Sequence, residues 1–444
     1  MPKEKLGILV GGGPAPGINS VISAATIRAL LQGVDVLGIR DGFDKLMKGR
    51  LEDIRPLQLG DVSRIHFTGG SILGSSRANP TKNEEDLALV VESLHRLGIT
   101  QLITIGGDDT AFSAMKVSEK AAGRLKVVHV PKTIDNDLDL DPSIDSFGYN
   151  TARSLGVELV KNLMVDAKTT SRWYFVVAMG RKAGHLALGI GKAAGATLSV
   201  IPEEFPKYKP TLRILVDILA GAMIKRLAGG RRYGVAVMAE GLAEGLPEED
   251  LKRLGPIEYD EHGHMRISEL NLGNGIKRAV YARLAGLGVP KINVVAKDIG
   301  YELRSSDPVP YDMEYTRDLG YCAAKYLFSG GHSAMVTLQG GNFVPIPFAQ
   351  LLDPATGRTR VRMVDIKSTR YAIARRYMIR LRRDDFDEPA LLAQFGAVCN
   401  PKRSAEEFRR EFGYVTENEA PPLDLLHVKD RENGRRVDAP IPSR

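Results

Sequence analysis

The 444-residue sequence predicts an α/β fold in which mostly parallel strands alternate with helices. Short apolar runs recur along the chain, and segments with helical periodicity separate them. Several of these runs are followed directly by glycines, as at the ends of 6–10 and 101–105. Strands separated by helices form βαβ units, whose parallel sheets are covered on both faces. The length corresponds to two to four domains or to one large interwoven unit.

Each expected element follows from its own residue pattern. The clearest helix is 84–97, which has acids in its first turn, an apolar face and Gly98 as its stop signal. The expected strands are 6–10, 34–39, 101–105, 126–130, 173–178, 234–238, 293–296 and 334–338. The other expected helices are 19–31, 150–163, 212–227 and 316–328, with a further helix beginning after Gly180.

Composition excludes several classes of protein. Hydrophobic residues make up 43% of the chain, which is enough for a full core and excludes disorder of the whole chain. The two cysteines, Cys322 and Cys399, form neither a disulfide framework nor a metal-ligand spacing. This cysteine usage favours a reducing, cytoplasmic location. No run reaches the eighteen or more apolar residues of a membrane span, so no membrane association is expected.

The positive charge is concentrated in one segment. Of the net +7, residues 358–383 carry +9, which leaves the rest of the chain at −2. Nucleic-acid binding is therefore not indicated. Five apolar residues at helical spacing suggest that the arginines of this segment line a solvated or subunit-facing side. These residues are Tyr371, Ala374, Tyr377, Met378 and Leu381.

Chemically informative residues follow the expected strands, where ligands bind in open α/β sheets. The Gly-rich run 11–17 lies between a strand and a helix, so it is either a phosphate cradle or a tight turn. Asp108 and Asp109 follow another strand. One of them could cap a helix, or both could face a phosphate through Mg²⁺.

The run 131–137 is the most informative stretch. It places a cation, a hydroxyl and two carboxylates after a strand, as Lys132, Thr133, Asp135 and Asp137. Phosphoryl transfer needs a base for the attacking hydroxyl, cations for the phosphoryl oxygens and a magnesium ligand. His185, in a basic turn after the strand 173–178, is expected to be a packed or surface histidine rather than a metal ligand.

Taken together, these segments resemble the phosphofructokinase family. The matching runs are Gly-Gly-Pro-Ala-Pro-Gly-Ile-Asn at 12–19, Gly-Gly-Asp at 106–108, Thr-Ile-Asp-Asn-Asp at 133–137, Met-Gly-Arg at 179–181, Ala-Glu-Gly at 239–241 and Gly-Tyr-Glu-Leu-Arg at 300–304. The resemblance implies two similar doubly wound α/β domains with the active site in the cleft between them. It also implies phosphoryl transfer to the 1-hydroxyl of fructose 6-phosphate, with Mg²⁺.

The resemblance assigns roles position by position. Asp135 resembles the general base, and Asp108 resembles the magnesium-associated acid. Arg181 resembles the cation that stabilises the transferring phosphoryl group. Donor contacts are expected from Gly13, Arg77, Asp108 and Asp109, with Lys132 and Thr133 as further catalytic residues. Sugar-phosphate contacts are expected from Thr133, Asp135, Asp137, Met179, Gly180, Arg181, Glu240, Tyr301 and Arg304.

Two arginines of the family reach the sugar phosphate from a neighbouring subunit. Arg172 matches the first, and Val295 stands where the second is expected, with Lys297 nearby as a substitute. The resemblance therefore implies a homodimer or homotetramer.

Two positions indicate the phosphoryl donor. Family members that use pyrophosphate combine an acid after Gly-Gly-Asp with Lys before Thr-Ile-Asp-Asn-Asp, and this chain has Asp109 and Lys132 there. A carboxylate at Asp109 would place negative charge where the α-phosphate of ATP would lie. We therefore expect pyrophosphate and fructose 6-phosphate as substrates, in a reaction close to reversible. ATP as the donor, sedoheptulose 7-phosphate as an acceptor, a silent regulatory subunit and a binding module built on the basic segment remain as alternatives.

The expected domains follow the family pattern. Residues 1–148 plus about 303–350 form the donor domain, and 149–302 plus about 351–416 form the sugar-phosphate domain. Residues 417–444 are polar and Pro-rich, which indicates a C-terminal tail.

Overall fold

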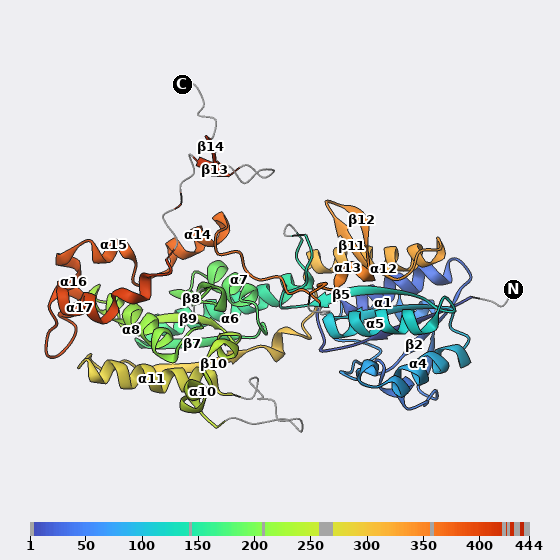
Figure 1. Ribbon diagram of the computed structural model, residues 1–444, viewed down its shortest axis with the longest axis horizontal. Helices are drawn as coiled ribbons and strands as arrows, with labels where there is room; N and C mark the ends of the chain where they lie inside the picture. The colour runs from blue at the N-terminus through green and yellow to red at the C-terminus, as the bar shows by residue number, and fades with distance from the viewer. Residues whose placement is uncertain are drawn as a thin grey trace.

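The computed structural model describes residues 4–141, 144–206, 209–256, 270–355 and 359–419, with residue 423 and the segments 427–429 and 436–438. Two lobes lie end to end, and each is built around its own sheet (Figure 1). The first sheet has eight strands and the second has four. The predicted α/β class with two sheet domains is confirmed.

The first sheet has the order β12-β11-β5-β4-β1-β2-β3, with β6 beside β5. All its pairs are parallel except β2 with β3 and β11 with β12. Its strands are β1 (Lys5–Val10), β2 (Asp35–Ile39), β3 (Ile54–Leu57), β4 (Gln101–Gly106), β5 (Lys126–Thr133), β6 (Phe147–Gly148), β11 (Ala334–Gln339) and β12 (Asn342–Pro347).

Helices cover both faces of this sheet because its strands are apolar on both sides. On β1, Ile8 joins the core that includes α1, whereas Leu9 joins the core that includes α4. The main helices are α1 (Ile18–Leu30), α4 (Glu84–Arg96), α5 (Asp108–Ala121) and α12 (Pro310–Phe328). The short ones are α2 (Asp44–Met47), α3 (Leu59–Val62), η1 (Pro80–Lys82) and α13 (Phe348–Leu351).

The second sheet is entirely parallel, in the order β10-β7-β9-β8. Its strands are β7 (Trp173–Ala178), β8 (Leu198–Val200), β9 (Gly234–Ala239) and β10 (Val294–Ile299). Every residue of β7 and β9 is buried, as expected of a sheet with both faces covered. Its helices include α6 (Tyr149–Thr170), α7 (His185–Ala194), α8 (Leu212–Ala228), α9 (Leu242–Gly245), α10 (Glu248–Leu254) and α11 (Leu272–Gly286), with the short turns η2 (Pro202–Glu204) and η4 (Tyr301–Leu303).

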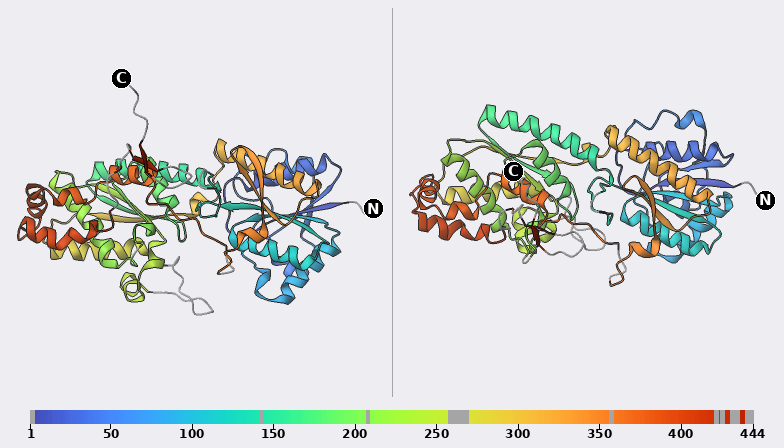
Figure 2. Two further views of the ribbon diagram at one scale, coloured as in Figure 1. Left: turned by 45° about the horizontal axis from the view of Figure 1, so that its top comes forward. Right: turned by 90° about the horizontal axis from the view of Figure 1, so that it is seen from above.

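The C-terminal region covers the outer end of the second lobe (Figure 2). It contains α14 (Thr369–Tyr377), α15 (Arg383–Phe386), α16 (Pro389–Gly396), α17 (Ala405–Phe412) and η5 (Gly413–Thr416). The expected tail from 417 onward lies largely outside the described residues, although β13 (His427–Lys429) and β14 (Arg436–Asp438) pair antiparallel. Within the described ranges, no helix is both long and apolar enough to cross a membrane.

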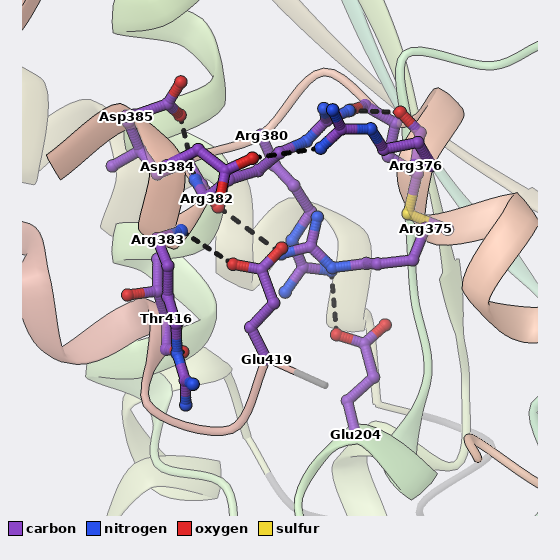
Figure 3. A network of polar contacts seen from close by, with 12 residues as sticks. Glu204, Arg375, Arg376, Arg380, Arg382, Arg383, Asp384, Asp385, Thr416 and Glu419 are labelled. Atoms are coloured by element: carbon purple, nitrogen blue, oxygen red, sulfur yellow. Dashed lines mark hydrogen bonds and ion pairs between the residues drawn. The ribbon is translucent and has the colours of Figure 1, made fainter. Parts of the chain in front are cut away.

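The basic segment differs from the sequence-based expectation. The helix α14 ends at Tyr377, which is 83% exposed, so Tyr377 does not belong to the expected apolar face. Arg375 and Arg380 are buried instead of lining a solvated or subunit-facing side. Arg380 Nη1 donates to Glu204 Oε2 at 2.8 Å, and Arg375 Nη2 lies 3.4 Å from Glu419 Oε1 (Figure 3). The backbone becomes extended at residue 378, so helical spacing no longer describes the residues after it.

A buried carboxylate joins the two lobes near the site. Asp312, on α12 of the first lobe, is fully buried. Its side chain accepts hydrogen bonds from Gly148 N at 3.0 Å and Thr151 N at 2.8 Å, at the start of α6. Because α6 leads into the second lobe, Asp312 helps to define the angle at which that lobe begins.

Candidate active site

One cavity of about 320 Å³ lies beyond the carboxyl ends of β1, β4 and β5, and residues of the second lobe close it. Such a position is the expected place for a ligand in an open α/β sheet. The cavity brings together most of the predicted site residues. These are Gly13, Arg77, Asp108, Asp109, Lys132, Thr133, Asp135, Asp137, Arg181 and Arg304.

The glycine run after β1 forms one wall of the cavity. A side chain at Gly11 would collide with Thr110, and Gly12 has a φ of 80°, which favours glycine. Gly12 N donates to Ser76 O at 2.8 Å, which brings the 74–77 turn and Arg77 alongside. The Lys132 ammonium donates to the Gly13 carbonyl. The wall therefore combines exposed backbone with cations, as an anion site requires.

Asp108 and Asp109 begin α5 and face the cavity. Burial, together with the charge of Asp137, raises the pKa of Asp108 to about 7. The Asp109 side chain is 79% exposed, and its Oδ2 lies 3.9 Å from Arg181 Nη2. The capping position of α5 is Gly107, so neither acid supplies a side-chain cap. The Asp109 carboxylate is thus exposed to a ligand in the cavity, next to Arg181.

Asp135 is buried, and its Oδ1 has no hydrogen-bond partner among the described residues. Burial raises its pKa to about 7, and the charges of Asp137 and Glu240 act in the same direction. Thr133 Oγ1 accepts from Asp135 N at 3.1 Å and donates to Asp137 Oδ1 at 3.2 Å, so one hydroxyl orders both acids. A buried carboxylate with a free oxygen and a pKa near neutrality is suited to accept a proton.

Lys132 is a buried cation near the end of β5, just before the loop that carries Asp135. Burial lowers its pKa to about 8. At neutral pH it therefore remains largely protonated and can bind an anion.

Arg181 extends from the loop after β7 into the cavity. Its φ is 46°, an uncommon value for a residue with a side chain. Glu240 Oε1 stabilises this turn, because it accepts from Gly180 N at 3.1 Å and from Arg181 N at 2.8 Å.

Other predicted sugar contacts lie beside the cavity and do not line it. Glu240 and Gly180 support the Arg181 turn. Met179 packs so closely on Gly300 that a Cβ there would lie 2.9 Å from Met179 Cε. Tyr301 is 70% exposed, and the Arg304 guanidinium lies 5.1 Å from the centre of its ring.

Arg172 is not brought to this cavity. It precedes β7, whereas Met179 follows it, and six strand residues span about 20 Å. Its Nε lies 3.8 Å from Asp166 Oδ2. Val295 and Lys297 lie on β10, where Lys297 pairs in register with Val176 of β7 and is exposed.

The cavity also contains residues that the sequence analysis missed. Asn79, Lys82 and Ser113 line it. Asn79 accepts from Thr81 N at 2.9 Å and so caps η1, which carries Lys82. The signal for Lys82 was its position in the same loop as Arg77, five residues further on. Ser113 lies one helical turn after Asp109, whose carbonyl accepts from its hydroxyl at 2.8 Å.

Comparison with known proteins shows the family. The phosphofructokinase family model matches residues 5–327, and the chain belongs to this family. The chain is 52% identical to the pyrophosphate–fructose 6-phosphate 1-phosphotransferase of Thermotoga maritima, over 93% of this chain and 99% of the relative. It is 48% identical to the enzyme of the same name from Naegleria fowleri, over 93% and 96%.

More distant relatives include an enzyme named for another donor. ATP-dependent 6-phosphofructokinase 2 of Streptomyces coelicolor is 33% identical, over 82% of this chain and 99% of the relative. A crystal structure of pyrophosphate-dependent phosphofructokinase from Marinobacter aquaeolei matches with a TM-score of 0.63 at 15% identity, covering 99% of this chain and 98% of that one. At that identity the match shows the fold alone.

Proposed function

We propose that this protein transfers a phosphoryl group from pyrophosphate to the 1-hydroxyl of fructose 6-phosphate, giving fructose 1,6-bisphosphate and phosphate. The observation that carries the proposal is the buried Asp135 carboxylate, whose Oδ1 has no hydrogen-bond partner among the described residues and which shares one cavity with Lys132 and Arg181. The names of the two relatives at 52% and 48% identity support the same reaction.

Each step of the transfer has a group to perform it. Asp135 takes the proton of the sugar 1-hydroxyl, and the oxygen of that hydroxyl forms a bond to one phosphorus atom of pyrophosphate. The bridging P–O bond then breaks, and phosphate leaves. Lys132 and Arg181 offset the negative charge on the transferring and leaving phosphates. Enzymes accelerate phosphoryl transfer mainly by such electrostatic stabilisation and by positioning of the reactants. Thr133 and Asp137 orient the acceptor, and Met179, Glu240, Tyr301 and Arg304 contact the sugar phosphate.

Asp109 and Lys132 make pyrophosphate the donor. The Asp109 carboxylate stands on the cavity wall beside Arg181, where it would repel the α-phosphate of ATP. Gly13 and Arg77 contact the smaller donor. Relatives at 33% and 32% identity are named as ATP-dependent enzymes, so ATP is the second candidate donor.

Asp108 fits a magnesium ion. Its carboxylate is largely removed from solvent and repelled by Asp137, so a cation between these acids would relieve an unfavourable charge. Mg²⁺ commonly takes one or two carboxylates and completes its shell with phosphate oxygens and water, so Asp108 would be a sufficient protein ligand beside a bound pyrophosphate. When bound, Mg²⁺ would neutralise phosphate charge.

The proposal also covers the cellular location, the oligomeric state and the roles of the two lobes. We place the enzyme in the cytoplasm as a homodimer or homotetramer, with donor contacts mainly from the first lobe and sugar contacts from the second. Sedoheptulose 7-phosphate remains a possible second acceptor. A silent regulatory subunit is disfavoured, because such a subunit would have no chemical need for Asp135.

The test is a donor and acceptor assay on the purified full chain with Mg²⁺. Fructose 6-phosphate is offered with pyrophosphate and then with ATP, and the Asp135→Ala variant is the inactive control. We expect turnover with pyrophosphate, and formation of pyrophosphate from fructose 1,6-bisphosphate and phosphate. A preference for ATP would overturn the donor assignment, and no turnover with either donor would overturn the enzyme assignment. Sedoheptulose 7-phosphate in a parallel arm tests the second acceptor.

A further inference from the structure

The connecting segment 359–366 passes between the two lobes on its way to α14 (Figure 1). It belongs to the basic segment, which the proposed reaction does not use. Val361 forms an antiparallel bridge with Leu138, and Arg362 N donates to Asp137 O at 2.8 Å. The connecting segment is thus attached directly to the loop that carries Asp135 and Asp137.

The Arg362 side chain donates several hydrogen bonds to acceptors of the same loop. Its Nε donates to Asn136 O at 3.2 Å, and its Nη2 donates to Asn136 Oδ1. Its Nη1 donates to Asp141 O at 3.1 Å and Ile144 O at 2.8 Å. One guanidinium therefore satisfies four acceptors of a single loop. Asn136, between the two acids, has a φ of 59°, so this turn depends on such support.

The backbone of the connecting segment holds the opposite loop. His185 Nε2 lies 3.1 Å from Arg362 O, and burial lowers the pKa of His185 to about 4, so its ring is neutral and donates. Val364 N donates to Glu203 Oε1 at 2.9 Å, and the same oxygen accepts from Gly184 N at 2.9 Å. Gly184 and His185 end the turn that carries Arg181. The expected packed role of His185 thus acquires a specific partner.

We propose that Arg362 is a positioning residue that sets the Asp135 loop against the Arg181 turn. Its side chain holds the base-bearing loop, and its backbone, with that of Val364, holds the cation-bearing turn. Transfer requires both Asp135 and Arg181 to be correctly placed around the reacting groups, and errors of about 1 Å in such geometry can cost about 10² in rate. The inference rests on the proposed function.

The test compares Arg362→Ala with Arg360→Ala. Arg360 lies on the same connecting segment, but it is half-exposed and its Nη1 lies 3.7 Å from Asp139 Oδ2. We expect Arg362→Ala to lower kcat about 10²-fold, with the KM for pyrophosphate little changed, because Gly13 and Lys132 are untouched. Arg360→Ala should behave like wild type. Guanidinium ion at millimolar concentration should partly restore the kcat of Arg362→Ala, which a general loss of stability would not allow.

Arg362→Lys keeps the charge but cannot reach four acceptors, so we expect about a 10-fold loss of kcat. This variant also serves if Arg362→Ala does not fold. Wild-type kcat in either folded Arg362 variant, or an equal loss in Arg360→Ala, overturns the inference. Absence of pyrophosphate turnover in wild type would instead overturn the proposed function, so the two failures are distinguishable.

Discussion

Glu240 Oε1 lies 2.8 Å from the backbone nitrogen of Arg181, so a predicted sugar contact also supports the turn that carries the proposed catalytic arginine. Because Arg181 has a φ of 46°, its turn needs an acceptor at this place. Glu240→Ala should therefore lower kcat by about 10² through misplacement of Arg181. Glu240→Gln retains an acceptor oxygen and should change the KM for fructose 6-phosphate more than kcat. Steady-state kinetics checks this, and equal losses of kcat in both variants would assign the effect to the charge of Glu240.

The pH dependence of kcat/KM should reflect two buried groups. Asp135 must be ionised to accept a proton, and its pKa of about 7 predicts that activity rises with pH through that region. If Lys132 binds pyrophosphate as proposed, it does so while protonated, and its pKa of about 8 predicts a decline in activity at higher pH. Asp135→Ala should lower turnover by about 10²–10⁴.

Lys132→Met is the control for the alkaline limb. Pyrophosphate itself also titrates, but this affects the wild-type protein and the Lys132→Met variant equally. The alkaline decline should therefore weaken in Lys132→Met relative to wild type. An unchanged decline would assign it to the substrate, and a folded Asp135→Ala variant with near-normal turnover would remove Asp135 as the base.

Donor choice should depend on Asp109 and Lys132. Asp109→Gly should lower the KM for ATP, because like charges placed together in a binding site cost several kcal/mol. Asp109→Asn keeps the size and removes the charge, so comparison of the two separates repulsion from steric exclusion. Lys132→Gly should weaken turnover with pyrophosphate, and the double variant should shift furthest toward ATP without simple additivity. If Asp109→Gly still does not use ATP, Asp109 does not determine the donor.

The sequence was most informative where a strand end is followed by glycines or acids. The runs after β1, β4 and β5 form one cavity because parallel strands place their carboxyl ends at one edge of the sheet. Each strand predicted from a local pattern also corresponds to a strand of the structure. Two helices are longer than expected. The helix α6 continues to Thr170, and α12 begins at Pro310, a residue that interrupts a helix except in its first turn.

Contacts between segments that lie far apart in the chain could not be predicted from the sequence. Arg362 meets the Asp135 loop from more than two hundred positions away, and no local pattern separates it from Arg360. No helix was expected over α11, where Gly273 and Gly275 weaken the helical signal. Gly275 has a packing reason, because a Cβ there would lie 2.7 Å from Leu254 O.

Arg172 should act only on the site of a neighbouring subunit. It lies at the end of β7 opposite to Met179, so it does not reach the cavity of its own chain. Mixing Arg172→Ala with Asp135→Ala subunits should restore activity, because one site of each hybrid then has an intact base and an intact partner arginine. Mixing Lys132→Met with Asp135→Ala should restore nothing, since both defects lie in the same kind of site. No recovery in the first mixture despite proven subunit exchange would contradict shared sites.

The buried pair of Arg380 with Glu204 should stabilise the second lobe only while both charges remain. Arg380 Nη1 donates to Glu204 Oε2 at 2.8 Å, and both side chains are buried. Arg380→Met removes the cation that is hydrogen-bonded to the buried Glu204 carboxylate, which predicts a loss of about 3–5 kcal/mol in the free energy of unfolding. Replacing Glu204 by Leu as well should recover much of that loss.

Trp173, the one tryptophan of the chain, is fully buried in β7, so its fluorescence in urea reports unfolding of this lobe. Arg376→Ala is the matched control, because Arg376 pairs with Asp384 at 3.1 Å at the surface and its loss should cost at most about 1 kcal/mol. If the double variant is no more stable than Arg380→Met, the cost arises from packing around Arg380 and not from the unpaired carboxylate.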